Sequence, residues 1–104
     1  MTREAVKISI YINEADEWNG KPLHLELLRT LHHQGVAGGT VIRAVAGFTG
    51  HGSAETAQQM DAGGKPPLVI QFIDGATKVE AVMAVVKAMA RNRLVVREPV
   101  QILD

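Results

Sequence analysis

The chain has 104 residues, 46% of them hydrophobic, and its eleven basic and eleven acidic side chains cancel to a net charge of zero. This length and composition predict one folded domain over residues 1–104 and exclude a disordered chain. A chain without net charge has no positive potential that would attract nucleic acid or an anionic membrane, so neither is an expected partner. The absence of cysteine excludes disulfides and thiolate metal sites. The N-terminus has no signal-peptide pattern, and no apolar run approaches the roughly 18 residues that span a bilayer. We therefore expect a cytoplasmic protein without membrane insertion.

The first third of the chain predicts a strand, a loop and a helix. Alternation from Val6 to Ile12 indicates a half-buried strand, because side chains two residues apart share a face. Residues 13–20 are polar and acidic and predict a loop. A helix then opens at Lys21-Pro22 and stops at Gly35, since proline suits a first turn and glycine a helix end. The apolar stripe of this helix consists of Leu23, Leu27, Leu28 and Leu31.

The rest of the chain predicts a turn at 37–39, a strand from Thr40 to Thr49, a long glycine-rich loop over 50–65 and a strand over 68–73. The loop has a candidate helical piece at 54–60. The capping-box pattern of Thr77 and Glu80 predicts a second helix, which ends at 91–93. Residues 94–103 predict a last strand, at a sheet edge or bent, because Pro99 cannot donate a ladder hydrogen bond.

The order β-α-β, loop, β-α-β predicts an α+β fold, a ferredoxin-like βαββαβ sandwich with a four-stranded antiparallel sheet and two helices on one face. The helix stripes require the sheet face that carries Ile8 and Ile10. The opposite face has no helix to cover it, and it carries Val and Ile residues beside Tyr11. We expect the chain to self-associate through this face.

Motifs for catalysis are missing from the sequence, so we expect a protein that is not an enzyme. The histidines lack the spacing of a zinc helix, and neither Ser9 nor Ser53 lies in a nucleophile elbow. The carboxylates of Asp16 and Glu17 indicate a solvated turn. Trp18, in a polar loop, indicates an exposed contact surface.

The glycines at 47, 50 and 52 indicate backbone that curls tightly and presents N–H groups to an anion. On pattern alone, a hairpin corner or a flexible loop root is the simpler explanation of these glycines. Phe48 fits the core or an aromatic face beside a bound base. The Arg91-Asn92-Arg93 corner fits phosphate binding or a helix cap, and the same two interpretations hold for Lys21.

Two runs resemble known families. Residues 35–52, GVAGGTVIRAVAGFTGHG, resemble the second strand and loop root of PII signalling proteins. Trp18-Asn19-Gly20-Lys21-Pro22-Leu23 resembles the signature of an uncharacterised PII-like family known by a domain-of-unknown-function label. The resemblance implies a PII-like regulatory protein that forms a homotrimer, senses a small ligand in clefts between subunits and binds a partner protein through a loop. A membrane transport protein is one candidate partner.

The resemblance also assigns residues, and it leaves the ligand open. It implies a ligand cleft lined by Thr40, Gly47, Phe48 and Thr49, and a partner-binding loop at the position of residues 50–65. In that loop we expect Gly50 and His51 to reach the ligand, since loop residues on a rigid scaffold often carry function, and Gly52, Ser53, Glu55 and Gln58 to contact the partner. PII proteins hold nucleotide phosphates with a turn rich in glycine and lysine, where this chain has Arg91 and Arg93. Arginine forks suit phosphate, so an adenine nucleotide or a smaller anion is expected. Two alternatives stay open: a metal-binding trimer of the cation-tolerance type, with His51 and Asp61 as ligands, and a small ferredoxin-like enzyme.

Overall fold

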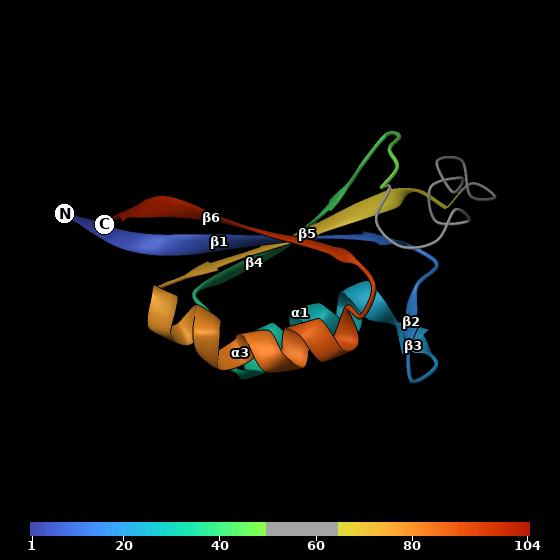
Figure 1. The fold of residues 1–104 in the computed structure, drawn as a ribbon, viewed down its shortest axis with the longest axis horizontal. Coiled ribbons are helices and arrows are strands. Elements are labelled where there is room, and N and C mark those ends of the chain that lie inside the picture. Colours follow the sequence, from blue (N-terminus) through green and yellow to red (C-terminus); the bar gives the residue numbers. More distant parts are fainter. Residues whose placement is uncertain (50–64) are drawn as a thin grey trace.

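A four-stranded antiparallel sheet with two helices on one face forms the part of the chain that the structure describes, residues 1–49 and 65–104 of a computed structural model (Figure 1). The sheet has the order β4-β5-β1-β6, with β1 at Thr2–Asn13, β4 at Gly38–Arg43, β5 at Pro67–Asp74 and β6 at Leu94–Leu103. The helices are α1, Leu23–His33, and α3, Ala76–Met89. This arrangement confirms the predicted ferredoxin-like fold. Of the predicted loop over 50–65, every residue except Lys65 lies outside the described residues, and so does its candidate helical piece.

The core lies between the helices and the sheet face that carries Ile8 and Ile10, as predicted. The central strands β1 and β5 each place every second side chain in the core, so the alternating pattern of β1 determines which face of the sheet is buried. The core comprises Val6, Ile8, Ile10 and Ile12 of β1, Leu68, Ile70 and Phe72 of β5, Leu23, Leu27 and Leu31 of α1, and Val79, Val82, Val86 and Met89 of α3. None of the helices in the described residues is long and apolar enough to cross a membrane.

A short hairpin with a two-residue turn leads into α1, where the sequence predicted a loop over 13–20 and a helix that opens at Lys21-Pro22. Its strands are β2, Glu17–Trp18, and β3, Lys21–Pro22, and the turn between them has positive φ at Asn19 (52°) and Gly20 (78°). Two positive φ angles are the property of a type I′ turn, which favours Asn-Gly. Trp18 packs partly buried against the core. The expectation of an exposed tryptophan was therefore wrong.

Strand β4 is shifted relative to its predicted range of 40–49. It includes Gly38 and Gly39, which were expected in a turn, and it ends at Arg43. The reason is the partner strand: β5 begins at Pro67, and the N–H of Ala44 donates to the Pro67 carbonyl at 2.9 Å. Beyond that bond β5 offers no further residues for pairing.

The capping-box prediction for α3 was wrong, although the helix exists. Gly75 is the N-cap and makes no side-chain cap bond, while Thr77 lies inside the first turn. Asp74 organises this entry instead, because its carboxylate accepts from the N–H of Gly75 at 2.7 Å and from that of Ala37 at 2.9 Å. The helix ends at Met89, just before the predicted stop at 91–93, and in the turn that follows the N–H of Arg93 donates to the Ala90 carbonyl at 3.0 Å.

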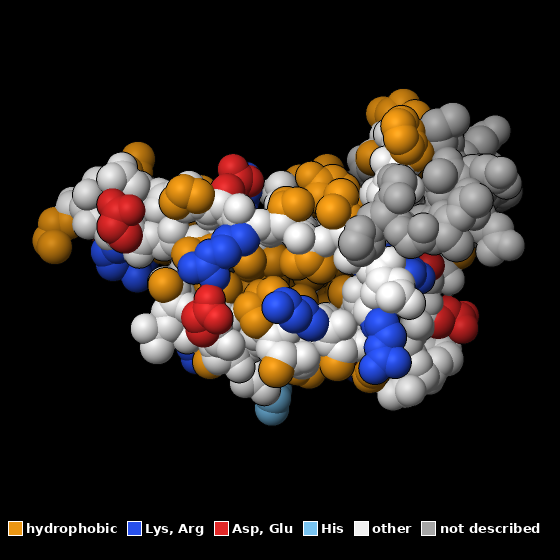
Figure 2. Space-filling view, in the orientation of Figure 1, with side chains coloured by type: hydrophobic (Ala, Val, Ile, Leu, Met, Phe, Trp, Pro, Cys, Tyr) orange, Lys and Arg blue, Asp and Glu red, His pale blue; other side chains and the backbone are white. Residues whose placement is uncertain are grey.

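The sheet face without helices, which we call the open face, is mixed in character. Its apolar members include Tyr11 of β1, Ile42 of β4, Val69 and Ile73 of β5, and Leu94 and Val96 of β6. Lys7, Ser9 and Gln71 lie among them, so the face is more polar than expected. Ile42 and Val96 remain 45% and 38% exposed. Figure 2 shows hydrophobic side chains along this upper side of the sheet.

Candidate functional site

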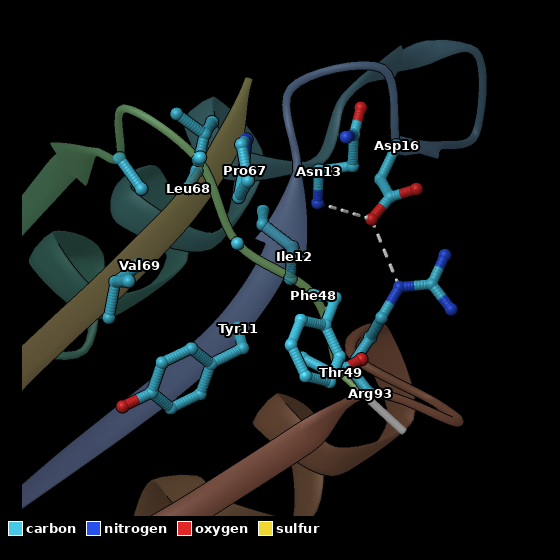
Figure 3. A pocket seen from close by; sticks show the side chains of 13 residues that line it. Tyr11, Ile12, Asn13, Asp16, Phe48, Thr49, Pro67, Leu68, Val69 and Arg93 are labelled. Carbon is cyan, nitrogen blue, oxygen red and sulfur yellow. Dashed lines mark hydrogen bonds and ion pairs between the residues drawn. The ribbon is translucent and has the colours of Figure 1, made fainter. Parts of the chain in front are cut away.

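A cavity of about 250 Å³ lies at the end of the sheet where β1 ends and β5 begins (Figure 3). The segment after β4 closes one side of it, and Arg93, the residue before β6, closes another. The described residues that line it are Tyr11, Ile12, Asn13, Asp16, Ala44, Ala46, Gly47, Phe48, Thr49, Pro67, Leu68, Val69 and Arg93. Four separate parts of the sequence therefore meet at one site.

Two aromatic rings give the cavity its character. Tyr11 enters from the open face of β1, and Phe48 comes from the segment after β4 (Figure 3). Phe48 is 67% exposed, so most of its ring is available to a bound molecule. Small apolar side chains and Pro67 form much of the remaining wall. Such a surface suits a flat, largely apolar group.

A hydrogen-bonded turn at residues 13–16 forms the polar side of the cavity. The side-chain oxygen of Asn13 accepts from the N–H of Ala15 at 2.8 Å, and the N–H of Asp16 donates to the Asn13 carbonyl at 3.0 Å. Oδ2 of Asp16 accepts from the N–H of Asn13 at 2.9 Å and from Nε of Arg93 at 3.0 Å. The Asp16 carbonyl also accepts from the N–H of Leu23 at 2.8 Å, which fixes the start of α1.

Asp16 is a site residue that the sequence-based prediction missed, because the carboxylate was interpreted as part of a solvated turn. Its side chain is 17% exposed and pairs with Arg93, which is 31% exposed. An Asn followed three residues later by Asp at a strand end is a turn signal that could have indicated a fixed carboxylate. Its partner Arg93 is 77 residues away, and nothing local in the sequence connects them.

Four of the predicted ligand residues do come together: Gly47, Phe48, Thr49 and Arg93 all line the cavity. Thr40 does not, because it pairs with Gln71, further along β5 than the residues 67–69 that line the cavity. The other predicted residues of this region, Gly50, His51, Gly52, Ser53, Glu55, Gln58 and the candidate metal ligand Asp61, lie outside the described residues.

The prediction that a glycine is needed at position 47 for a tightly curled backbone was wrong. Among the described glycines only Gly20 and Gly35 have positive φ, and a Cβ on Gly47 would meet the Pro67 ring at an ordinary 3.7 Å. Glycine is therefore not required at this position by the backbone. The tight curl that was expected to present N–H groups to an anion is absent at Gly47.

Arg91 lies in a second, shallower hollow beside the cavity, which we call the basic depression. It is lined by Lys87, Ala90, Arg91, Asn92, Arg93, Leu94 and Val95, and has a volume of about 350 Å³. Arg93 lines both hollows. The described residues around the depression include three cations and no carboxylate, so it is the more favourable of the two hollows for an anion.

The other predicted positions have structural roles. Trp18, Gly20, Lys21 and Pro22 form the β2–β3 hairpin, and none of them lines the cavity. Within residues 1–49 and 65–104 no three His, Cys, Asp or Glu side chains are grouped as a metal site would require.

Comparison with known proteins relates this fold to PII-like proteins. The solved structure of CPII from Thiomonas intermedia K12, bound to ADP, AMP and acetate, superposes with a TM-score of 0.67 at 17% identity, covering 100% of this chain and 93% of that one. A putative PII-like signaling protein from Thermus thermophilus gives a TM-score of 0.57 at 12% identity, over 97% and 89% of the two chains. The predicted PII-like fold is thereby confirmed.

Sequence relatives agree. A UPF0166 protein of Aquifex aeolicus (strain VF5) is 26% identical over 96 residues, which are 92% of this chain and 90% of that protein. The model of the family DUF190, described as "Uncharacterized ACR, COG1993", matches residues 5–102. The chain therefore belongs to the DUF190 family, and it has a PII-like fold.

Proposed function

We propose that this chain is a regulatory ligand-binding protein that holds an adenine nucleotide in the cavity at the end of the sheet. The observation that carries the proposal is Phe48, an aromatic ring that is 67% exposed at the wall of a largely apolar cavity. Exposed rings at such positions stack on nucleobases, which contributes about 1–3 kcal/mol per base. The similar fold of CPII, a protein whose structure holds ADP and AMP, supports the same choice of ligand.

Size and charge suggest how the nucleotide would lie. The cavity, at about 250 Å³, is smaller than the roughly 300–1,000 Å³ of most small-molecule pockets, so it suits the base better than a whole nucleotide. The basic depression begins at Arg93, on the cavity wall, and extends to Lys87 and Arg91. The base would lie against Phe48, and the phosphates would lie toward these cations.

The proposal includes a homotrimer in which the ligand lies between subunits. Ile42, Val96 and Val69 leave apolar surface on the open face, and Tyr11 belongs to both that face and the cavity wall. A second copy packed on the open face would therefore approach the ligand as well. Light scattering after size-exclusion chromatography measures the assembly, and a monomer at micromolar concentration would contradict this part.

The proposal assigns binding, and no reaction, to the cavity. Asp16 is the one carboxylate among its described lining residues, and two donors already engage the same oxygen. A carboxylate so engaged is a poor general base. The partner protein, reached through residues 50–65, and the cytoplasmic location stay predictions.

Calorimetric titration with ATP, ADP and AMP tests the proposed function. At least one of them should bind the wild-type protein. In a thermal denaturation the same nucleotide should raise the melting temperature, because a ligand that binds only the folded state stabilises it. A folded protein that binds none of the three would contradict the adenine-nucleotide proposal.

A further inference from the structure

The cation best placed to hold a ligand phosphate is already paired inside the protein. Arg93 is the one cation among the described residues that line the cavity, and its Nε lies 3.0 Å from Oδ2 of Asp16. Figure 3 shows this pair at the wall, with the bond from Asn13 to the same oxygen. Asp16 and Arg93 cancel, so the described wall of the cavity carries no net charge.

We infer that Asp16 determines the charge specificity of this site: its carboxylate competes with ligand phosphates for Arg93 and disfavours ligands in proportion to their negative charge. This inference rests on the proposed function. It names the regulation of the same site, and it makes Asp16 the specificity-determining residue for a ligand that carries a phosphate.

Burial makes the competition effective. The Asp16 side chain is 17% exposed and that of Arg93 is 31% exposed, so water and salt screen the pair less than they screen a surface ion pair. A phosphate that approaches Arg93 must either displace the carboxylate or share the guanidinium with it. Both cost more as the charge of the phosphate chain increases, because like charges repel at short range.

The carboxylate is not needed for the turn itself. The N–H of Asn13 requires an acceptor at Oδ2, and an amide oxygen provides one equally well. The hydrogen bonds from Leu23 to the Asp16 carbonyl and from Ala15 to Asn13 do not involve the carboxylate. Asp16→Asn therefore removes the charge and retains the local structure, and Asp16→Ser offers a hydroxyl acceptor as a second neutral variant.

A matched control lies two residues away. Glu14 forms an ion pair with Arg43, and neither side chain lines the cavity. Glu14→Gln changes the net charge of the protein by the same amount as Asp16→Asn. Any difference between the two variants therefore reports the position of the charge and not the total charge.

The test is calorimetric titration of wild type, D16N, D16S and E14Q with AMP, ADP, ATP and inorganic tripolyphosphate. Removal of a neighbouring like charge typically shifts an ionic equilibrium by at least about tenfold. We expect D16N and D16S to bind ATP about tenfold more tightly than wild type, with a smaller gain for AMP, and E14Q to bind as wild type does.

The outcomes separate the inference from the proposed function. Three outcomes overturn the inference alone, provided that the wild-type protein binds a nucleotide. D16N and D16S show no gain in affinity, they gain the same affinity for AMP, ADP and ATP, or E14Q gains as much affinity as they do. Weaker binding by D16N and D16S also overturns it, since Asp16 would then be positioning Arg93 for the ligand. If no variant binds any nucleotide or tripolyphosphate, both the inference and the adenine-nucleotide proposal are wrong.

Discussion

Replacing Phe48 with alanine should weaken binding at the proposed ligand site much more than it weakens the fold. The ring is 67% exposed, so about one third of it is covered by the protein. Complete burial of a phenylalanine contributes about 1.5–3 kcal/mol, and truncation of this ring should therefore cost only about 0.5–1 kcal/mol of folding stability. A base stacked on the ring contributes about 1–3 kcal/mol, which corresponds to roughly a 5- to 150-fold loss of affinity.

Two measurements check this prediction. Urea denaturation gives the change in the free energy of unfolding, and calorimetric titration with ADP gives the change in affinity. Val45→Ala is the matched control, because Val45 belongs to the same segment, is fully exposed and does not line the cavity. Unchanged ADP affinity in F48A, or an equal loss in V45A, would show that the ring does not contact the ligand.

Three further predictions concern the fold and the assembly. Gly20→Ala should lower the free energy of unfolding by about 1–2 kcal/mol, because alanine is strained at a φ of 78°. Gly47→Ala should change it by less than about 0.5 kcal/mol, because the backbone does not require glycine there. Urea denaturation measures both variants, and effects of similar size would contradict the argument from φ. Ile10→Ala, at 0% exposure, should cost about 2–5 kcal/mol in the same assay, and a cost below about 1 kcal/mol would contradict the assigned core. Val96→Glu on the open face should dissociate the proposed oligomer in light scattering, whereas Leu25→Glu on the exposed side of α1 should not.

Local patterns in the sequence predicted the elements of the fold, and partner strands decided their ends. Alternation in Val6 to Ile12 identified the buried face of β1 because each side chain has a fixed direction in a strand. Val45 and Phe48 continue a strand-like composition past Arg43, yet β4 ends there because β5 begins only at Pro67. That limit depends on a segment far along the chain, so the local composition did not reveal it.

The candidate site was predictable in part. Gly47, Phe48, Thr49 and Arg93 were identified through the family resemblance and through the arginine fork, and all four line the cavity. Asp16 was missed because its burial comes from tertiary contacts, which give a polar turn a role that its composition does not show. Asn19-Gly20 is different, because this pair is itself a local hairpin signal and the β2–β3 turn was predictable from it.

Tyr11 connects the candidate site to the proposed assembly, because it lies on the open face and on the cavity wall. If copies of the chain pack on that face and the ligand contacts both of them, ligand binding and subunit association strengthen each other by the same factor. ADP should therefore shift the equilibrium between monomer and trimer toward the trimer, and the monomeric V96E variant should bind ADP more weakly than wild type. Analytical ultracentrifugation with and without ADP measures the first effect, and calorimetric titration of V96E the second. Wild-type affinity in a monomeric V96E would mean that one chain forms the complete site, and the proposed cleft between subunits would then be wrong.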